Sequence, residues 1–220
     1  MSSRRLMLDR IRAALADVPA DERPQDVPVP RGYRRSHATG DLADLFAARV
    51  ADYRASVVRC APPAVAATVR ATLAARGVRT VVVPEGFPPD WLPEAPGLRV
   101  RRDRPPLTVQ ELDALDGAVT TAALAIAVTG TLVLDAGPGQ GRRALTLVPD
   151  HHLCVVRASQ IAADVPGALA TLDPTRPLTF VSGPSATSDI ELDRVEGVHG
   201  PRVLDVLLVE DRPGHPPVRQ

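Results

Sequence analysis

Lysine is absent from this chain of 220 residues, and all 26 of its basic residues are arginines. A pyridoxal-phosphate enzyme or a Schiff-base aldolase needs a lysine amine to bond to a carbonyl group, and an ordinary P-loop needs the Walker A lysine. Those three chemistries are therefore excluded. Because 26 acidic residues balance the arginines, the formal net charge is zero, which argues against nucleic acid as a partner.

Cysteine is also scarce. Cys60 and Cys154 are the only two, and each lies in a strand-like apolar run. We expect both to be buried free thiols, which suits a reducing compartment and hence a cytoplasmic protein. Two thiolates cannot supply the four that hold an iron–sulfur cluster. We therefore expect no cofactor and no metal site in this chain.

Long apolar runs are missing as well. The longest, Ala122–Val128, stops before Thr129 and Gly130, far short of the ~20 residues that span a membrane. The first residues are positive but no apolar segment follows them, so we predict neither a membrane span nor a signal peptide. Apolar residues still make up 45% of the chain, which is enough for a sizeable core.

Residues 1–55 are predicted to form an N-terminal helical appendage with a connector. Ser3–Ala16 has the apolar spacing of a short amphipathic helix, and the proline-rich segment Asp17–Arg35 is typical of an extended linker. A second helix is expected to begin at Thr39 or Asp41 and to run to about Ala55. Residues 211–220 contain three prolines and are predicted to be a loose tail.

Residues 56–210 alternate between short apolar runs and helical patterns, which predicts an α/β domain with a doubly wound, mostly parallel sheet. The predicted helices are Ala64–Ala75, Val109–Leu115, Ile161–Leu172 and Ser188–Glu196. The predicted strands are Val57–Val58, Thr80–Pro84, Leu98–Arg101, Gly117–Thr121, Thr131–Asp135, Ala144–Val148, Leu153–Arg157, Leu178–Val181 and Val203–Val209.

One candidate site follows a predicted strand in Phe180–Glu191. A glycine turn leads to a helix start at which Ser188 and Glu191 fit a capping box. Hydroxyls and free backbone N–H groups in this position could hold a carboxylate or phosphate at the carboxyl edge of the sheet, although an ordinary capped turn has the same pattern. The candidate anion-binding residues are Gly183, Ser185, Thr187 and Asp189.

A second candidate is the glycine-rich stretch that runs from Val128 to Arg143. Its glycines allow close approach of a ligand, and an arginine pair can bind an anion with two hydrogen bonds. The spacing does not match a dinucleotide fingerprint, and a hairpin loop with solvated arginines is the alternative. The candidate anion-binding residues are Gly130, Thr131, Gly139, Gly141 and Arg142.

Two histidines are candidates for catalysis. His152 stands beside His151 and Asp150 before a strand, where it could act as a base or serve as a structural hydrogen bonder. His199 lies between Gly197 and Gly200 at the entry to the last strand. If that strand lies beside Leu178–Val181, His199 comes near the Ser185 loop; a simple helix-ending turn is the alternative.

Taken together, these segments resemble the lactate-utilization protein C family, whose fold is called the LUD domain. The similar segments are Thr129–Asp135, Gly137–His152, Ser182–Glu191 and Val195–Pro201, within a resemblance that covers roughly Val57 to Val209. The resemblance implies a fold like that of the sugar-phosphate isomerase, CoA-transferase and formyltetrahydrofolate cyclo-ligase superfamily. It also implies partner proteins that carry iron–sulfur clusters, with which this chain would oxidise L-lactate to pyruvate, and a small organic acid as ligand.

One position departs from the family pattern, which usually reads Glu-Thr-Gly-Thr where this chain has Val128 before Thr129. If that glutamate is an acid or base, its replacement argues against catalysis by this chain. This replacement favours a subunit of a lactate-oxidising system or a regulatory module over a free-standing enzyme, but both alternatives to the subunit stay open. One is a free-standing enzyme of the isomerase or CoA-transferase fold, and the other is a regulatory module that binds an organic acid without chemistry.

Overall fold

The structure is a computed structural model, and it describes residues 2–19, 21–26, 29–30, 32, 38–92, 95–187, 195–197 and 199–211. The chain divides into two compact units, residues 1–34 and 35–220. In the first unit, helix α1 (Ser3–Ala14) begins at Ser2, whose side chain accepts a hydrogen bond from the backbone of Arg5, and a short 3-10 turn, η1, covers Pro24–Asp26. No residue of α1 is buried.

Helix α2 (Leu42–Asp52) belongs to the second unit. Asp41 caps it by accepting hydrogen bonds from Ala43 N and Asp44 N, as the sequence led us to expect. Its inward side chains, Phe46 and Val50, are fully buried in the core beneath the central sheet. The second unit spans residues 35–220 and includes α2, whereas the sequence pattern predicts an appendage that includes this helix and an α/β domain that begins at residue 56.

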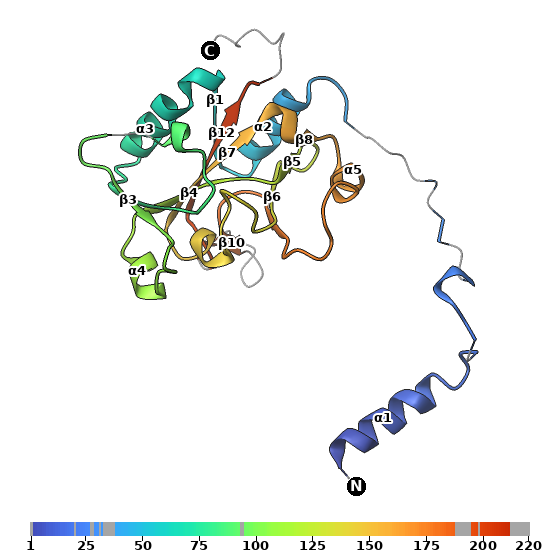
Figure 1. Cartoon of the computed structure of the whole chain (residues 1–220). Helices are drawn as coiled ribbons and strands as arrows, with labels where there is room; N and C mark the ends of the chain where they lie inside the picture. The colour runs from blue at the N-terminus through green and yellow to red at the C-terminus, as the bar shows by residue number, and fades with distance from the viewer. Residues whose placement is uncertain are drawn as a thin grey trace. The chain divides into compact units, whose positions relative to one another are not determined.

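A six-stranded sheet forms the centre of this unit, and every neighbouring pair in it is parallel (Figure 1). The predicted α/β class with a mostly parallel sheet is confirmed. Valine dominates these strands because a sheet covered on both faces favours continuous apolar runs. In spatial order the strands are β1 (Ser56–Cys60), β12 (Val203–Val209), β7 (His151–Arg157), β4 (Gly117–Thr121), β2 (Thr80–Val83) and β3 (Arg99–Arg102).

Different elements cover the two faces of this sheet. Helix α3 (Val65–Ala75), preceded by the 3-10 turn η2 (Pro62–Ala64), buries Val65, Val69 and Leu73 on one face. Helix α2, helix α4 (Val109–Asp113) and a second sheet pack on the other face. The second sheet has the order β8 (Ile161–Ala162), β5 (Leu124–Ile126), β6 (Thr131–Leu134) and β9 (Thr179–Val181).

Three further predictions were wrong in part. Ala144–Val148 is not a strand, because its first residues lie in a 3-10 turn, η4 (Arg143–Thr146). The helix expected at Ile161–Leu172 is shortened to α5 (Val165–Leu169), which Asp164 caps after strand β8. Strand β9 pairs antiparallel with β6 in the second sheet and does not join the parallel sheet.

The helix expected at Ser188–Glu196 falls mostly outside the described residues. Its last two residues form strand β11 (Val195–Glu196), which pairs antiparallel with β10 (Ala186–Thr187). The remaining short elements are the 3-10 turns η3 (Pro89–Trp91) and η5 (Ala158–Gln160). Cys60 and Cys154 are buried free thiols, as predicted. Among the described residues, no helix has the length and apolar character needed to cross a membrane.

Candidate functional site

A cavity of about 240 Å³ lies where strands β7 and β12 begin, and we call it the amino-edge cavity. Its walls come from η4, from the start of β7, from the loop after β9 and from the turn before β12. Its polar lining residues are Arg143, Thr146, His152, Thr179, Ser182, Ser185 and His199. Both candidate histidines and part of the first candidate anion site therefore meet in one place.

His152 is the second residue of β7, and its side chain points to the same face of the sheet as that of Thr120 in β4. The ring Nε2 and the Thr120 hydroxyl form a hydrogen bond of 2.8 Å. Burial, together with the nearby charge of His151, lowers the pKa of His152 to about 3. The imidazole is therefore neutral at physiological pH, and it is a hydrogen-bonding group rather than a strong base.

Ser185 ties the two loops of the cavity together. Its backbone N–H donates to Pro201 O at 2.9 Å, and its hydroxyl accepts a 3.1 Å hydrogen bond from the backbone N–H of His199. His199 does lie beside the Ser185 loop, but for a different reason from the one expected. Strand β12 lies between β1 and β7 and does not adjoin β9.

The loop after β9 therefore lies at the amino edge of the parallel sheet, because Pro201 comes just before β12. The prediction that this loop lies at the carboxyl edge is wrong, because β9 is not a strand of the parallel sheet. Thr187 belongs to β10, and the predicted anion ligand Asp189 lies outside the described residues.

Arg143 is the arginine that lines the cavity. Its Nη1 donates to the hydroxyl of Thr179 at 2.7 Å, and within the described part of the chain it has no carboxylate partner. An arginine without a carboxylate partner beside hydroxyl groups is suited to binding a small carboxylate. Searched over the same residues, no group of three metal-ligating side chains was found.

Thr131 supports the cavity from behind. Its hydroxyl lies 2.7 Å from the hydroxyls of both Ser182 and Thr129. Gly130 and Gly183 serve packing instead, because a Cβ at Gly130 would lie 2.7 Å from the backbone of Arg49. A Cβ at Gly183 would likewise lie 2.6 Å from the side chain of Tyr53. Both glycines thus let the end of α2 approach closely.

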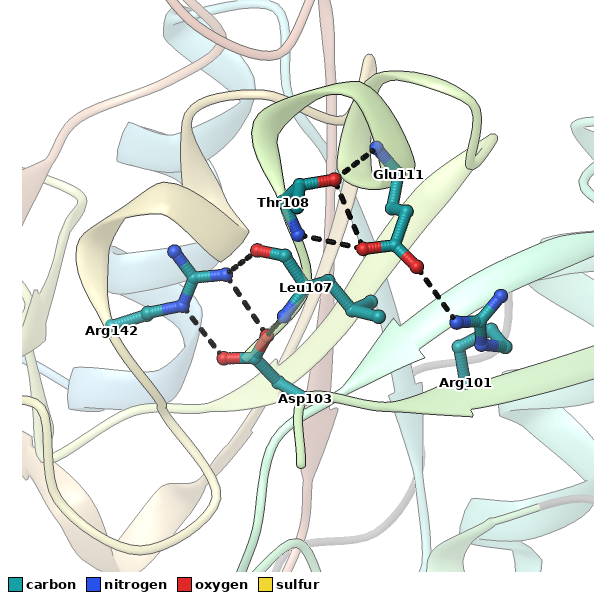
Figure 2. A network of polar contacts seen from close by, with 6 residues as sticks. All are labelled: Arg101, Asp103, Leu107, Thr108, Glu111 and Arg142. Atoms are coloured by element: carbon teal, nitrogen blue, oxygen red, sulfur yellow. Dashed lines mark hydrogen bonds and ion pairs between the residues drawn. The ribbon is translucent and has the colours of Figure 1, made fainter. Parts of the chain in front are cut away.

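The remaining candidates lie away from this cavity. Arg142 makes two hydrogen bonds with Asp103, at 2.8 and 3.0 Å, and a third with the carbonyl of Leu107 (Figure 2). Burial would raise the pKa of Asp103, but the hydrogen bonds from Arg142 and from the backbone N–H of Leu107, together with the charge of Arg142, lower it overall. Arg142 is therefore a structural clamp that holds the start of the α4 segment, which Thr108 and Glu111 cap (Figure 2).

Gly139 and Gly141 belong to a loop that packs against the carboxyl ends of the strands. Gly139 N donates to Glu85 O at 2.8 Å, and Thr121 N donates to Gly139 O at 2.7 Å. Val128, where the family usually has glutamate, does not line the amino-edge cavity; it packs against a small apolar cluster with Ala162 and Leu172.

Sequence reasoning did not single out Thr120 or Thr179 as site residues. Thr120 stands in an otherwise apolar strand and is fully buried. A polar residue inside such a strand needs a hydrogen-bond partner. Thr120 therefore indicated that a second polar side chain, which the structure identifies as His152, lies beside it. Thr179 offered no such signal, because Arg143 lies 36 residues before it.

Comparisons with known proteins point to one family. Residues 102–209 match the LUD domain. The chain is 42% identical to a "Lactate utilization protein C" of Deinococcus radiodurans over 92% of this chain and 93% of that protein. It is 33% identical to a protein of the same name from Halalkalibacterium halodurans over 47% of this chain and 48% of that one.

A solved structure also resembles the chain. A crystal structure of a DUF162 family protein from Deinococcus radiodurans matches with a TM-score of 0.66 and 38% sequence identity. The match covers 83% of this chain and 99% of the other. This chain and that protein therefore share the same overall fold.

Proposed function

Because this chain belongs to the lactate utilization protein C family, we propose that it serves lactate utilization as the subunit without a cluster in a cytoplasmic multiprotein system. In this proposal the system oxidises L-lactate to pyruvate. The chain binds the small organic acid, and its partner proteins carry the iron–sulfur clusters. The amino-edge cavity is the observation that carries this proposal, because it places an arginine beside hydroxyls and two histidines.

The polar groups of the cavity suit a 2-hydroxy acid. The Arg143 guanidinium can donate two hydrogen bonds to a carboxylate. The hydroxyls of Ser182 and Thr179 line the same cavity. His152 is buried and neutral, with a pKa of about 3, so it can orient a substrate hydroxyl but is too weak a base to remove its proton readily. His199, in contrast, is exposed to solvent.

The electrons released by the reaction need an acceptor. Oxidation of lactate to pyruvate removes two electrons and two protons. Burial raises the pKa of Cys154 to about 12, which keeps it a thiol, and Cys60 lies on another strand. Two separated thiols cannot form the four-thiolate ligand set of a cluster. Clusters in partner proteins would supply the acceptor.

A regulatory module that binds the acid without chemistry is the second candidate. Two observations favour it: Val128 stands where the family usually has glutamate, and His152 is too weak a base at neutral pH. Both candidates require the amino-edge cavity to bind a small carboxylate. Only the first requires turnover when the partner proteins are present.

Calorimetric titration tests the binding site. The wild type, Arg143→Gln and the control Arg102→Gln are titrated with L-lactate, D-lactate and pyruvate. Arg102 is an exposed arginine of β3 outside the amino-edge cavity. Loss of a charge-assisted hydrogen bond at Arg143 should weaken binding at least about tenfold, whereas Arg102→Gln should bind as wild type does. Equal binding by Arg143→Gln and wild type would refute the site.

Turnover is tested separately. The purified chain is assayed for pyruvate formation from L-lactate with an artificial electron acceptor, alone and after addition of the proteins encoded beside its gene. We expect activity only in the mixture. Robust turnover by the isolated chain would overturn the subunit role. Binding without turnover in any mixture would favour the regulatory module.

A further inference from the structure

A second and larger cavity, of about 800 Å³, lies at the opposite edge of the parallel sheet. We call it the carboxyl-edge cavity. Its walls are the segments that follow β2, β4 and β7, together with part of the glycine-rich loop. The side chains that matter below are Trp91, Thr121, Gln140, Arg157, Gln160 and Arg176. None of them lines the amino-edge cavity.

The topology of the sheet makes this a natural ligand site. Strands β2 and β4 are neighbours, but after β2 the chain leads to β3 in the same sheet, whereas after β4 it leads to β5 of the second sheet. Loops that diverge in this way open a crevice at the carboxyl ends of the strands, where α/β proteins usually bind their ligands. Trp91 reaches the cavity from the segment after β2, and Thr121 reaches it from the end of β4, where the two segments diverge.

The glycine-rich loop closes the floor of this crevice. Gly139 connects the segment after β2 with the end of β4 through its backbone hydrogen bonds with Glu85 and Thr121. A Cβ on Gly86 would lie 2.7 Å from Pro138, so the loop fits closely against the segment after β2. A cavity with a fixed floor is preorganised for a ligand.

A stacked arginine forms one wall. The Arg157 guanidinium carbon lies 4.8 Å from the centroid of the Trp91 ring, and Trp91 meets Phe87 edge-on at 6.3 Å between ring centroids. Gln160 accepts a hydrogen bond from Arg157 N at 2.9 Å, which fixes the end of β7. Arg157 has no carboxylate partner among the residues that the structure describes. Stacking leaves the N–H groups at the edge of the guanidinium free to bind an anion.

The charge of the lining is positive. Arg176 pairs with Asp135 at 2.9 Å, so these two charges cancel and Arg157 is left as the excess cation of the lining residues. Apolar side chains, among them Leu124, Ile161 and Leu172, complete the walls. Such a lining fits a ligand with one anionic end and a flat or apolar body.

We propose that the carboxyl-edge cavity binds a planar organic anion, larger than a three-carbon acid, whose carboxylate or phosphate is held by Arg157 beside Trp91. This site is separate from the amino-edge cavity and does not depend on the lactate proposal. A ligand here would be a second small molecule, such as a cofactor or an effector, for a protein that handles a small acid at the other edge.

Trp91 provides a local test, because it is the only tryptophan in the chain. Its fluorescence is followed in the full-length protein during titration with adenosine 5′-monophosphate, benzoate, inorganic phosphate and L-lactate. We expect at least one of the two ring-bearing anions to change the emission saturably, and phosphate and lactate to leave it unchanged. The comparison of the nucleotide with benzoate separates a phosphate site from a carboxylate site.

Variants locate the binding. Arg157→Gln should weaken binding of the active probe about tenfold or more, and Arg157→Lys should weaken it less, because the charge remains while the stacked plane is lost. Arg143→Gln and Arg102→Gln should leave the affinity for this probe unchanged. Calorimetry on the same variants guards against a change in emission without a change in affinity, and thermal unfolding verifies that each is folded. The proposal fails if no probe binds, if Arg157→Gln binds as wild type does, or if Arg143→Gln abolishes binding.

Discussion

Asp205 in strand β12 accepts a hydrogen bond from Nε2 of His151 in the neighbouring strand β7, at 2.8 Å. The same carboxylate accepts two hydrogen bonds from Arg76, at 3.0 and 2.7 Å, at the end of α3. Asp205 is 1% exposed. This buried carboxylate, with a histidine and an arginine as hydrogen-bond partners, joins two strands and the helix that covers them, so its contribution to stability can be measured.

Burial would raise the pKa of Asp205, but the hydrogen bonds from His151 and Arg76 outweigh it and lower the pKa to about 2. A lowered carboxyl pKa stabilises the fold above about pH 4, and this stabilisation is lost as the pH falls toward about 2. Asp205→Asn should therefore reduce the free energy of unfolding at neutral pH by about 3 kcal/mol. Urea unfolding measures this. As a control, Asp150→Asn breaks the exposed pair with Arg202 and should cost less than about 1 kcal/mol.

The lowered pKa of His152 predicts a second pH dependence of the free energy of unfolding. Burial and then His151 lower its pKa from 6.5 to about 3, so below about pH 6.5 the unfolded chain binds a proton that the folded chain does not. Stability should fall by up to about 1.4 kcal/mol per pH unit between about pH 6.5 and pH 3. In His152→Gln this part of the slope should disappear, as measured by urea unfolding at several pH values. An unchanged slope would mean that His152 takes up protons in the folded state.

Alanine substitutions at Gly139 and Gly77 distinguish the cost of a steric clash from the cost of an unfavourable backbone φ. Its φ is +76°, and a Cβ would lie 2.6 Å from the hydroxyl of Thr121. Gly77 has a similar φ of +70° but nothing within 4 Å of its Cβ position. Gly77→Ala should thus cost about 1 kcal/mol from φ alone, and Gly139→Ala should cost clearly more. Thermal unfolding of both variants compares their stabilities. Equal destabilisation would show that the loop around Gly139 accommodates the extra methyl group without a further loss of stability.

The two N-terminal helices should differ in their importance. Deleting residues 2–19 should leave the melting temperature of the remaining chain unchanged within error, because no residue of α1 is buried. Phe46→Ala in α2 should destabilise the protein by about 3–5 kcal/mol, since Phe46 is fully buried. Scanning calorimetry measures both. A large shift on deletion would show that α1 contributes to the core after all.

Local patterns predicted the interior strands well. Gly117–Thr121 and Val203–Val209 have the predicted bounds, because a short, mostly apolar segment that contains β-branched residues and lies between turn signals is typical of a buried strand. Ala144–Val148 was mistaken for a strand because a short apolar run of five residues fits a 3-10 turn equally well. The inclusion of both histidines in β7 also could not be read from the sequence.

The candidate site depended on long-range contacts, which local patterns do not contain. Arg142 and Arg143 look equivalent in the sequence, yet Asp103, 39 residues earlier, engages the first, while the second lines the amino-edge cavity. Likewise, because β9 pairs with β6, the Ser185 loop lies at the amino edge of the parallel sheet and not at the predicted carboxyl edge. Partner choice between distant segments is set by the global packing.

Strand β7 runs from one cavity to the other, with His152 near its start and Arg157 at its end. Five residues of extended chain separate their Cα atoms by about 16 Å. Two small molecules held at these ends could not touch, so no group could pass directly between them. Communication between them would rely on the stiffness of a strand bonded to neighbours on both sides. A change in the middle of β7, at Cys154 or Val155, is thus the kind of mutation that should disturb binding at both ends together.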